Sequence, residues 1–214
     1  MSTSVVIPLF PQFTALDGIG PYEVLQRVPE FDITFIGHER GVVRSDNGML
    51  GIEVDGTFEE HPTPDVIVFP GGHGTRALMD DRRVLDWVRN AHPSTTFTTS
   101  VCTGSLVLAA AGLLDGLTAT THWGALDVLT EHGSIPTGDR VVEHLDQRII
   151  TAAGVSSGID MALRLVEIMV DRTAAQASQL MIEYDPQPPF DMGSTAKASD
   201  EVVTRVIEYA QHRS

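Results

Sequence analysis

Short runs of consecutive apolar residues alternate along this chain with segments in which apolar residues recur every three or four positions. Four such runs are expected to be strands: residues 5–10, 31–36, 66–69 and 95–101. The first and third are almost wholly apolar, which is typical of parallel strands buried on both faces. Helical patterns cover the intervening residues 21–28, 80–91 and 104–114. This alternation predicts an α/β fold, a mostly parallel sheet with helices on both faces.

Two antiparallel hairpins are predicted from turn residues that stand between β-prone segments. In VVRSDNGMLGIEV the turn is Asn47-Gly48, directly after the second strand, and in VVEHLDQRIIT it falls around residues 145–147. Asn-Gly is the strongest short hairpin signal because both residues tolerate a left-handed backbone.

The last third of the chain is predicted to be helical around one loop. Amphipathic patterns cover residues 157–170 and 173–184, and a last helix is expected over residues 200–212. Between them, residues 185–195 (DPQPPFDMGST) are rich in proline and glycine, so they are predicted to form a loop or arm. We find no internal repeat and no domain-scale linker, and therefore expect one domain over residues 1–214.

Charge and cysteine content narrow the class of protein. Among 214 residues, 29 are acidic and 14 basic, which gives a net charge of −15. This charge disfavours nucleic acid and anionic membranes as partners. Cys102 is the single cysteine, which excludes an internal disulfide and a cysteine-based zinc finger. With no leader pattern before VVIPLF and no apolar run of membrane-spanning length, we expect a cytoplasmic protein.

The segment TTSVCTGSLVLAAAGLL places Cys102 at the end of a predicted strand. Gly104 then opens an alanine- and leucine-rich helix. Ligands of open α/β sheets bind at the carboxyl ends of strands, and the positive end of the helix would favour the thiolate. Cys102 is therefore a candidate nucleophile. A single cysteine is equally well explained as a small buried apolar residue, and spacing alone leaves both interpretations open.

A glycine-rich turn, FPGGHGTRALM, follows the third strand. Its backbone N–H groups could bind an anion or an oxyanion, because glycine allows close approach of the backbone. The stretch from Gly72 to Ala77 also matches a dinucleotide-binding fingerprint. It follows a middle strand, however, and no acidic residue ends the next strand to hold a ribose. We therefore favour an oxyanion-binding turn.

Asp17 and His122 are further polar residues near predicted strand ends. Pro21 suits the first turn of a helix, which would place Asp17 in the loop before it. A carboxylate near a thiol can act as a general acid or base, although a helix-capping aspartate is the simpler interpretation. For His122, packing or a hydrogen bond is favoured over catalysis. No histidine spacing is typical of a metal site.

Five motifs occur in the order LDGIGPYEVL, VFPGGHG, TSVCTGSLVLAAAGLLDG, ATTHW and SGIDMAL. In this set and order the chain resembles the ThiJ/PfpI superfamily. The resemblance implies a flavodoxin-like three-layer sandwich with a nucleophile elbow, a strained strand-to-helix turn that carries the cysteine. The late segment QLMIEYDPQPPFDMGS extends the similarity to the isocyanide (isonitrile) hydratase branch.

The resemblance implies a role for each candidate residue. Cys102 would attack the carbon of an isocyanide, R–N≡C, to give a thioimidate. Asp17 would hydrogen-bond the thiol and relay protons, and Thr103 would help to orient the site. The backbone amides of Gly72 and Thr103 would line the pocket where negative charge develops, and His73 would lie in the substrate-binding turn. Hydrolysis of the thioimidate releases an N-substituted formamide, a hydration that needs no metal and no organic cofactor.

Departures from superfamily patterns bear on the alternatives. Other members usually carry a glutamate in the first loop, and the proteases carry a histidine after the cysteine. Asp17 and Thr103 stand there instead, which argues against a glyoxalase- or amidase-like enzyme. A cysteine-based redox sensor or stress-response protein remains an alternative, because an accessible thiolate oxidises readily. The segment 151–154 (TAAG) stands where the hydratases tend to have a glycine run, which could alter the following helix.

The resemblance also implies partners. Superfamily members are usually homodimers, and residues 185–195 could cross to a second copy, because the apolar Phe190 needs a covering surface. The substrates would be a small neutral isocyanide and water. A related branch fuses this domain to an AraC-type DNA-binding module. Since the chain ends at Ser214 and carries −15, we expect no contact with nucleic acid.

Overall fold

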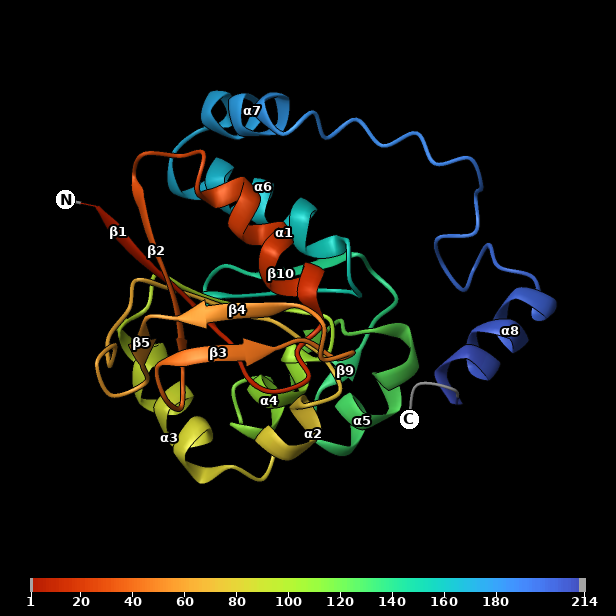
Figure 1. Cartoon of the computed structure of the whole chain (residues 1–214), viewed down its shortest axis with the longest axis horizontal. Coiled ribbons are helices and arrows are strands. Elements are labelled where there is room, and N and C mark those ends of the chain that lie inside the picture. Colours follow the sequence, from red (N-terminus) through yellow and green to blue (C-terminus); the bar gives the residue numbers. More distant parts are fainter. Residues whose placement is uncertain (1, 212–214) are drawn as a thin grey trace. The chain divides into compact units, whose positions relative to one another are not determined.

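The computed structural model describes residues 2–211, in two units, Met1–Ile182 and Glu183–Ser214. The first unit is built on a seven-stranded sheet of order β10-β11-β7-β6-β1-β2-β5 (Figure 1). Its strands are β1 (Thr3–Pro8), β2 (Phe31–Gly37), β5 (Gly56–Thr57), β6 (Val66–Phe69), β7 (Phe97–Val101), β10 (Val141–His144) and β11 (Ile149–Ala152). Every neighbouring pair is parallel except β10 with β11. The predicted α/β fold is confirmed, whereas a single domain over residues 1–214 stays a prediction.

Helices cover the sheet in two groups, above and below it in Figure 1. One group packs together as α1 (Ala15–Leu25), α6 (Ser157–Met169) and α7 (Arg172–Met181). The other contains α2 (Thr75–Leu78), α3 (Arg82–Ala91), α4 (Gly104–Ala110) and α5 (Leu126–Glu131). The central strands β6 and β7 are buried along their whole length between these groups. Burial on both faces explains why their sequences are apolar or small without alternation.

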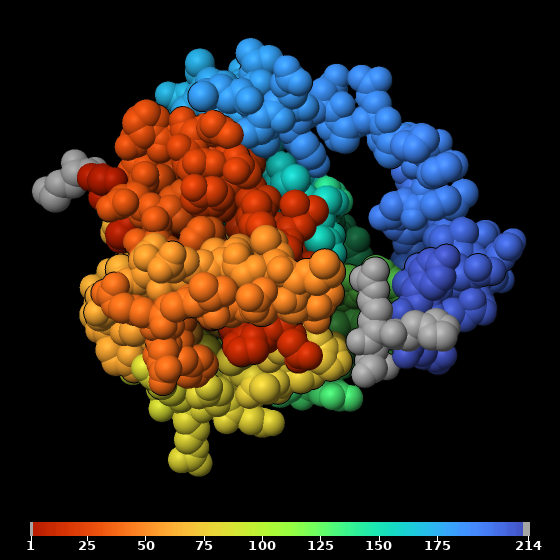
Figure 2. All heavy atoms as spheres, viewed as in Figure 1, coloured from red at the N-terminus to blue at the C-terminus, as the bar shows by residue number. Residues whose placement is uncertain are grey.

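Both predicted hairpins are confirmed. Strands β3 (Gly41–Arg44) and β4 (Gly51–Val54) pair antiparallel, and Gly48 in their turn has a φ of 73°. Figure 2 shows this hairpin, in orange, on the surface of the first unit. The second hairpin is β10 with β11. A short parallel pair, β8 (Thr118–Ala119) with β9 (Ile135–Pro136), was not expected from the sequence.

The prediction that Asp17 lies in a loop before a helix starting at Pro21 is wrong. Helix α1 begins at Ala15, so Asp17 is in its first turn and Pro21 is inside it. Pro21 has no N–H to donate to the Asp17 carbonyl, which costs the helix one backbone hydrogen bond. Helix α1 nevertheless forms because its buried face packs against α6. Tertiary packing therefore outweighs the local preference of proline for a helix start.

Helix ends differ from the prediction for local reasons. The helix expected over 104–114 ends at Ala110, because Gly112 adopts a φ of 81°, a left-handed conformation that is common just after a helix. Helix α3 begins after Asp81, whose side chain accepts hydrogen bonds from the N–H groups of Arg83 and Val84. The start of α7 is capped by Asp171 in the same way.

The second unit holds the predicted arm and the last helix. Residues 185–195 form neither helix nor strand, as expected. Helix α8 spans Asp200–Gln211, and the predicted end at residue 212 lies outside the described residues. Both parts leave apolar side chains exposed, among them Phe190 at 78% and Tyr209 at 61%. None of the helices within residues 2–211 has the length and hydropathy needed to cross a bilayer.

Candidate active site

Three adjacent strands, β7, β6 and β1, end at one edge of the sheet, and the candidate residues follow them. Cys102 comes directly after β7 and has a φ of 54°. A non-glycine residue with such a φ is strained, and strained backbones concentrate at functional sites. The expected elbow is therefore present. The thiol side chain is buried, since Cys102 is only 5% exposed.

The elbow is held by close packing and by hydrogen bonds to the backbone of Cys102. The Cys102 N–H donates to the carbonyls of Ala152 and Ala153, at 3.0 and 3.1 Å. The hydroxyls of Ser105 and Thr121 both donate to the Cys102 carbonyl, at 3.1 and 3.0 Å. Thr121 was not singled out from the sequence, where only its place in ATTHW marked it. These bonds stabilise a conformation that Cys102 would otherwise leave.

Two successive backbone amides of the glycine turn donate hydrogen bonds to side chains of the candidate site. Gly71 N–H donates to Asp17 Oδ2 at 3.0 Å, and Gly72 N–H donates to Thr103 Oγ1 at 2.9 Å. Gly72 has a φ of 140°, and a Cβ there would lie 2.4 Å from the Gln12 carbonyl oxygen. The turn therefore requires glycine. Its two N–H groups bind a carboxyl and a hydroxyl of the protein itself, and Gly71 was missed in the sequence.

Asp17 and Cys102 form a buried acid–thiol pair. Asp17 is fully buried, and its Oδ1 meets no nitrogen or oxygen donor among residues 2–211. Burial raises the pKa of Asp17 from an ordinary 3.8 to about 7, although hydrogen bonds from the Cys102 thiol and the Gly71 N–H act in the opposite direction. The carboxylate of Asp46, in the β3–β4 hairpin, adds to the rise. Near neutral pH both protonation states of Asp17 are therefore populated.

Burial opposes the preference for the thiolate that the helix end is expected to give Cys102. Burial, followed by the charge of Asp17, raises the pKa of the thiol above its ordinary value. The N–H and hydroxyl of Thr103 hydrogen-bond to the sulfur and lower this pKa, but by less than burial raises it. Helix α4 has only seven residues, so its dipole is small. The thiol must therefore lose its proton to a neighbouring base as it reacts.

The structure thus brings together Cys102, Asp17, Thr103 and Gly72. His73 follows in the same glycine turn, and its side chain is exposed. His122 is partly buried, and its Nδ1 accepts a hydrogen bond from the Gly124 N–H at 3.2 Å. Burial lowers the pKa of His122, and the charge of Arg76 adds to this effect. These contacts agree with a packing and hydrogen-bonding role for His122.

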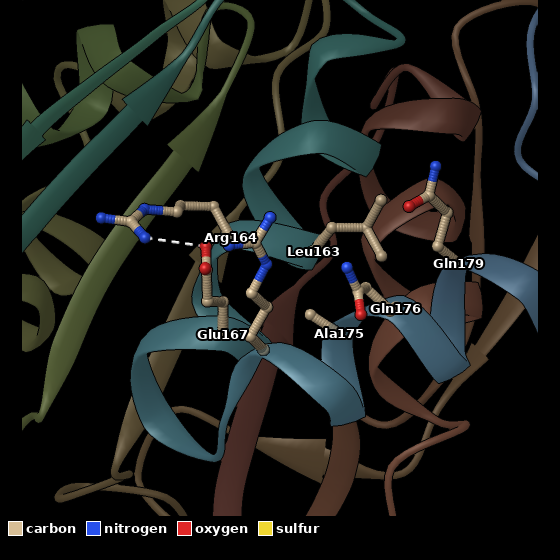
Figure 3. Close-up of a pocket in the computed structure, with 7 residues that line it drawn as sticks. Leu163, Arg164, Glu167, Ala175, Gln176 and Gln179 are labelled. Atoms are coloured by element: carbon tan, nitrogen blue, oxygen red, sulfur yellow. Dashed lines mark hydrogen bonds and ion pairs between the residues drawn. The ribbon is translucent and has the colours of Figure 1, made fainter.

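A surface hollow between α6 and α7 is a separate feature (Figure 3). Arg164 borders it and is already paired with Glu143 and Glu167, at 2.8 Å in each case. None of the candidate residues lines this hollow. In residues 2–211 there is also no cluster of three or more histidine, cysteine or acidic side chains that could hold a metal ion.

Comparison with known proteins was consistent with this geometry. The model of the DJ-1/PfpI family matches residues 3–168. The isonitrile hydratase of Pseudomonas putida is a homologue with 44% identity over 95% of this chain and 88% of that protein. The HTH-type transcriptional regulator CdhR of Pseudomonas aeruginosa is 28% identical over 96% of this chain and 61% of the regulator. A solved ThiJ/PfpI family protein from Pseudomonas syringae has 37% identity and a TM-score of 0.92, covering 99% of this chain and 87% of that one.

Proposed function

This chain belongs to the DJ-1/PfpI family, and from that premise we propose that it is a hydro-lyase that converts isocyanides to N-substituted formamides. The observation that carries the proposal is the buried pair of Cys102 and Asp17 at the elbow. The near full-length homology to an isonitrile hydratase supports the choice of substrate. In this proposal Cys102 is the nucleophile, and Asp17 moves each proton.

In the first half-reaction, the Asp17 carboxylate accepts the thiol proton while Cys102 Sγ bonds to the terminal carbon of R–N≡C. Asp17 then delivers this proton to the same carbon, which gives the thioimidate R–N=CH–S–Cys102 and restores the carboxylate. A carboxyl with a pKa of about 7 is suited to both tasks, because a base and an acid work best near the operating pH. The hydroxyl and N–H of Thr103 would stabilise the sulfur as it loses its proton.

In the second half-reaction, water adds to the thioimidate. The Asp17 carboxylate takes a proton from the water as its oxygen bonds to carbon, and this proton passes to the substrate nitrogen. Loss of the hydroxyl proton to Asp17 then forms the carbonyl, the C–S bond breaks, and the sulfur regains a proton. The product is R–NH–CHO, so one water has been added and every group of the protein is restored.

The remaining site residues have supporting roles in the proposal. Gly72 N–H fixes the Thr103 hydroxyl, and the Thr103 N–H faces the sulfur where negative charge develops. The exposed His73 would border the substrate entrance. An isocyanide is neutral, so the net charge of −15 neither steers nor repels it. The reaction uses no cofactor, and turnover should persist after dialysis against a chelator.

The test is formamide formation from p-nitrophenyl isocyanide by the purified protein. Cys102→Ala is expected to abolish turnover, and Asp17→Asn to reduce it severely, because an amide cannot relay the proton. Asp127→Asn, an exposed carboxylate on α5, is the matched control and should retain full activity. Absence of formamide with the unaltered protein, or equal turnover by Cys102→Ala, would contradict the proposal.

We also propose that the protein is a cytoplasmic homodimer in which residues 185–195 cross to the second copy. The support is the exposed Phe190 in that segment, with the exposed Met192 two residues later. Exposed apolar side chains that occur together are typical of a surface that binds another protein. Size-exclusion chromatography with light scattering should give twice the chain mass. A monomer at micromolar concentration would refute the dimer, and Phe190→Ser should weaken it.

A further inference from the structure

Arg76 is an exposed arginine that contacts the polar network beside the elbow. It follows Thr75 in α2, and its Nη1 donates to the buried Thr75 hydroxyl at 3.2 Å. That hydroxyl lies 3.1 Å from Thr103 Oγ1, and Thr103 is the residue directly after Cys102. A single buried hydroxyl therefore links the Arg76 guanidinium to the residue next to the candidate nucleophile.

The charge of Arg76 also acts on His122, which comes from a different segment of the chain. It lowers the pKa of His122, in addition to the larger effect of burial. His122 follows Thr121, whose hydroxyl donates to the Cys102 carbonyl at 3.0 Å. The guanidinium of Arg76 therefore lies close to two separate segments that contact the elbow.

Within residues 2–211, Arg76 forms no ion pair with a carboxylate, although the chain has 29 acidic residues. A guanidinium carries several N–H groups in a planar fork, and one of those of Arg76 donates to Thr75. The remaining N–H groups can bind a carboxylate that does not belong to the described chain. Seven other arginines already have carboxylate partners: Arg27, Arg40, Arg83, Arg89, Arg140, Arg164 and Arg205.

The surroundings of the elbow repel a negatively charged substrate unless a cation lies nearby. Asp17 is negative when ionised, the Asp46 carboxylate acts on the same site, and the net charge is −15. Arg76 offsets this repulsion locally, because attraction between opposite charges is strongest at short range. Since the isocyanide carbon must reach Cys102 Sγ, only a short substituent can keep a carboxylate beside Arg76.

We propose that Arg76 is a specificity-determining residue that pairs with a carboxylate on a short substituent of the isocyanide. This inference rests on the proposed hydration, and it names isocyano-carboxylates as the preferred substrate class. The reacting N≡C group stays neutral, and only the substituent is charged. With isocyanoacetate, one water would be added by the steps given above, and the product would be N-formylglycine with its carboxylate unchanged.

The experiment compares isocyanoacetate with its methyl ester, which has no charge at the same position. The unaltered protein should have the lower KM for the acid. Arg76→Gln should reduce the ratio of the acid kcat/KM to the ester kcat/KM about tenfold, because a charge-assisted hydrogen bond is lost. Arg76→Lys keeps the charge and loses the planar fork, so it should reduce this ratio by less. Added salt should raise the KM for the acid more than that for the ester.

Arg82→Gln is the matched control. Arg82 is an exposed arginine at the start of α3, and its replacement changes the net charge by the same amount. The acid-to-ester ratio of this variant should equal that of the unaltered protein. If Arg76→Gln does not fold, Arg76→Met, which keeps a straight side chain and also removes the charge, gives the same comparison.

A second measurement needs no turnover. Binding of N-formylglycine, followed by calorimetry, should weaken about tenfold in Arg76→Gln and should be unaffected in Arg82→Gln. If no isocyanide is hydrated while this difference in binding holds, the proposed function fails and the carboxylate site stands.

Two results would overturn the proposal for Arg76. One is an unchanged acid-to-ester ratio in a folded Arg76→Gln or Arg76→Met protein, whether or not both activities fall together. The other is an equal reduction of the ratio by Arg82→Gln, which would assign the effect to net charge. If isocyanides are hydrated and either result is found, the proposed function stands and the role of Arg76 fails.

Discussion

Replacing Asp17 by asparagine is expected to stabilise the protein while it inactivates the site. Burial raises the pKa of this carboxyl from 3.8 to about 7, so the native protein retains a proton that the unfolded chain has already lost between those pH values. The free energy of unfolding therefore falls as the pH rises through this interval. Above about pH 7 the native state ionises too, and the loss is complete.

The size of the effect follows from the two pKa values. Each pH unit contributes about 1.4 kcal/mol, and the interval from 3.8 to about 7 gives a total of about 4 kcal/mol. Asparagine is neutral at every pH and avoids this cost. Its oxygen can still accept the Gly71 N–H, and its NH₂ group would replace Asp17 Oδ1, which has no nitrogen or oxygen donor among residues 2–211.

The assay is urea unfolding of the parent and of Asp17→Asn across this pH range. The stability advantage of the variant should grow by about 1.4 kcal/mol per pH unit between 3.8 and 7 and then level off. Asp127→Asn, which changes an exposed carboxylate, should show no such trend. An advantage that is constant with pH, or that shrinks as the pH rises, would refute the assignment of a raised pKa to Asp17.

Three further outcomes are expected. The kcat/KM for isocyanide should rise with pH through about 7, because Asp17 must first be ionised to accept the thiol proton; a flat profile would exclude this role. Asp46→Asn should move this limb to lower pH by a few tenths of a unit, because the Asp46 carboxylate is exposed and its repulsion of Asp17 is screened. Gly104→Ala should destabilise the protein by about 2 kcal/mol or more in urea unfolding, since its Cβ would lie 2.1 Å from the Phe69 carbonyl oxygen; parental stability would show that the elbow can relax.

The central strands and the elbow could be predicted because their signals are local. Strand β6 is a run of apolar residues followed by glycines, and Cys102 stands between a β-prone run and a glycine that opens a helix. Such patterns predict the local structure directly, because a strand buried on both faces and a tight turn each require particular residue types. The sequence therefore predicted both the candidate nucleophile and its position at the edge of the sheet.

The start of α1 and the protonation of the site could not be predicted, because both depend on distant parts of the chain. Pro21 favours a helix start locally, but packing on α6 extends α1 back to Ala15. The thiol pKa depends on burial beneath the assembled fold and on Asp17. Phe13 bridges to both Ser45 and Gly72, which brings the hairpin with Asp46 to the site. No local pattern encodes these long-range contacts.

The most direct test of the account is the mass of the protein during turnover. Acid quenching of a mixture with p-nitrophenyl isocyanide, followed by intact-protein and peptide mass spectrometry, should reveal an adduct heavier by one isocyanide and located on Cys102. The same treatment of Cys102→Ala should give no adduct and no formamide. Formamide produced without an adduct on Cys102, or produced equally by Cys102→Ala, would contradict covalent hydration at the elbow.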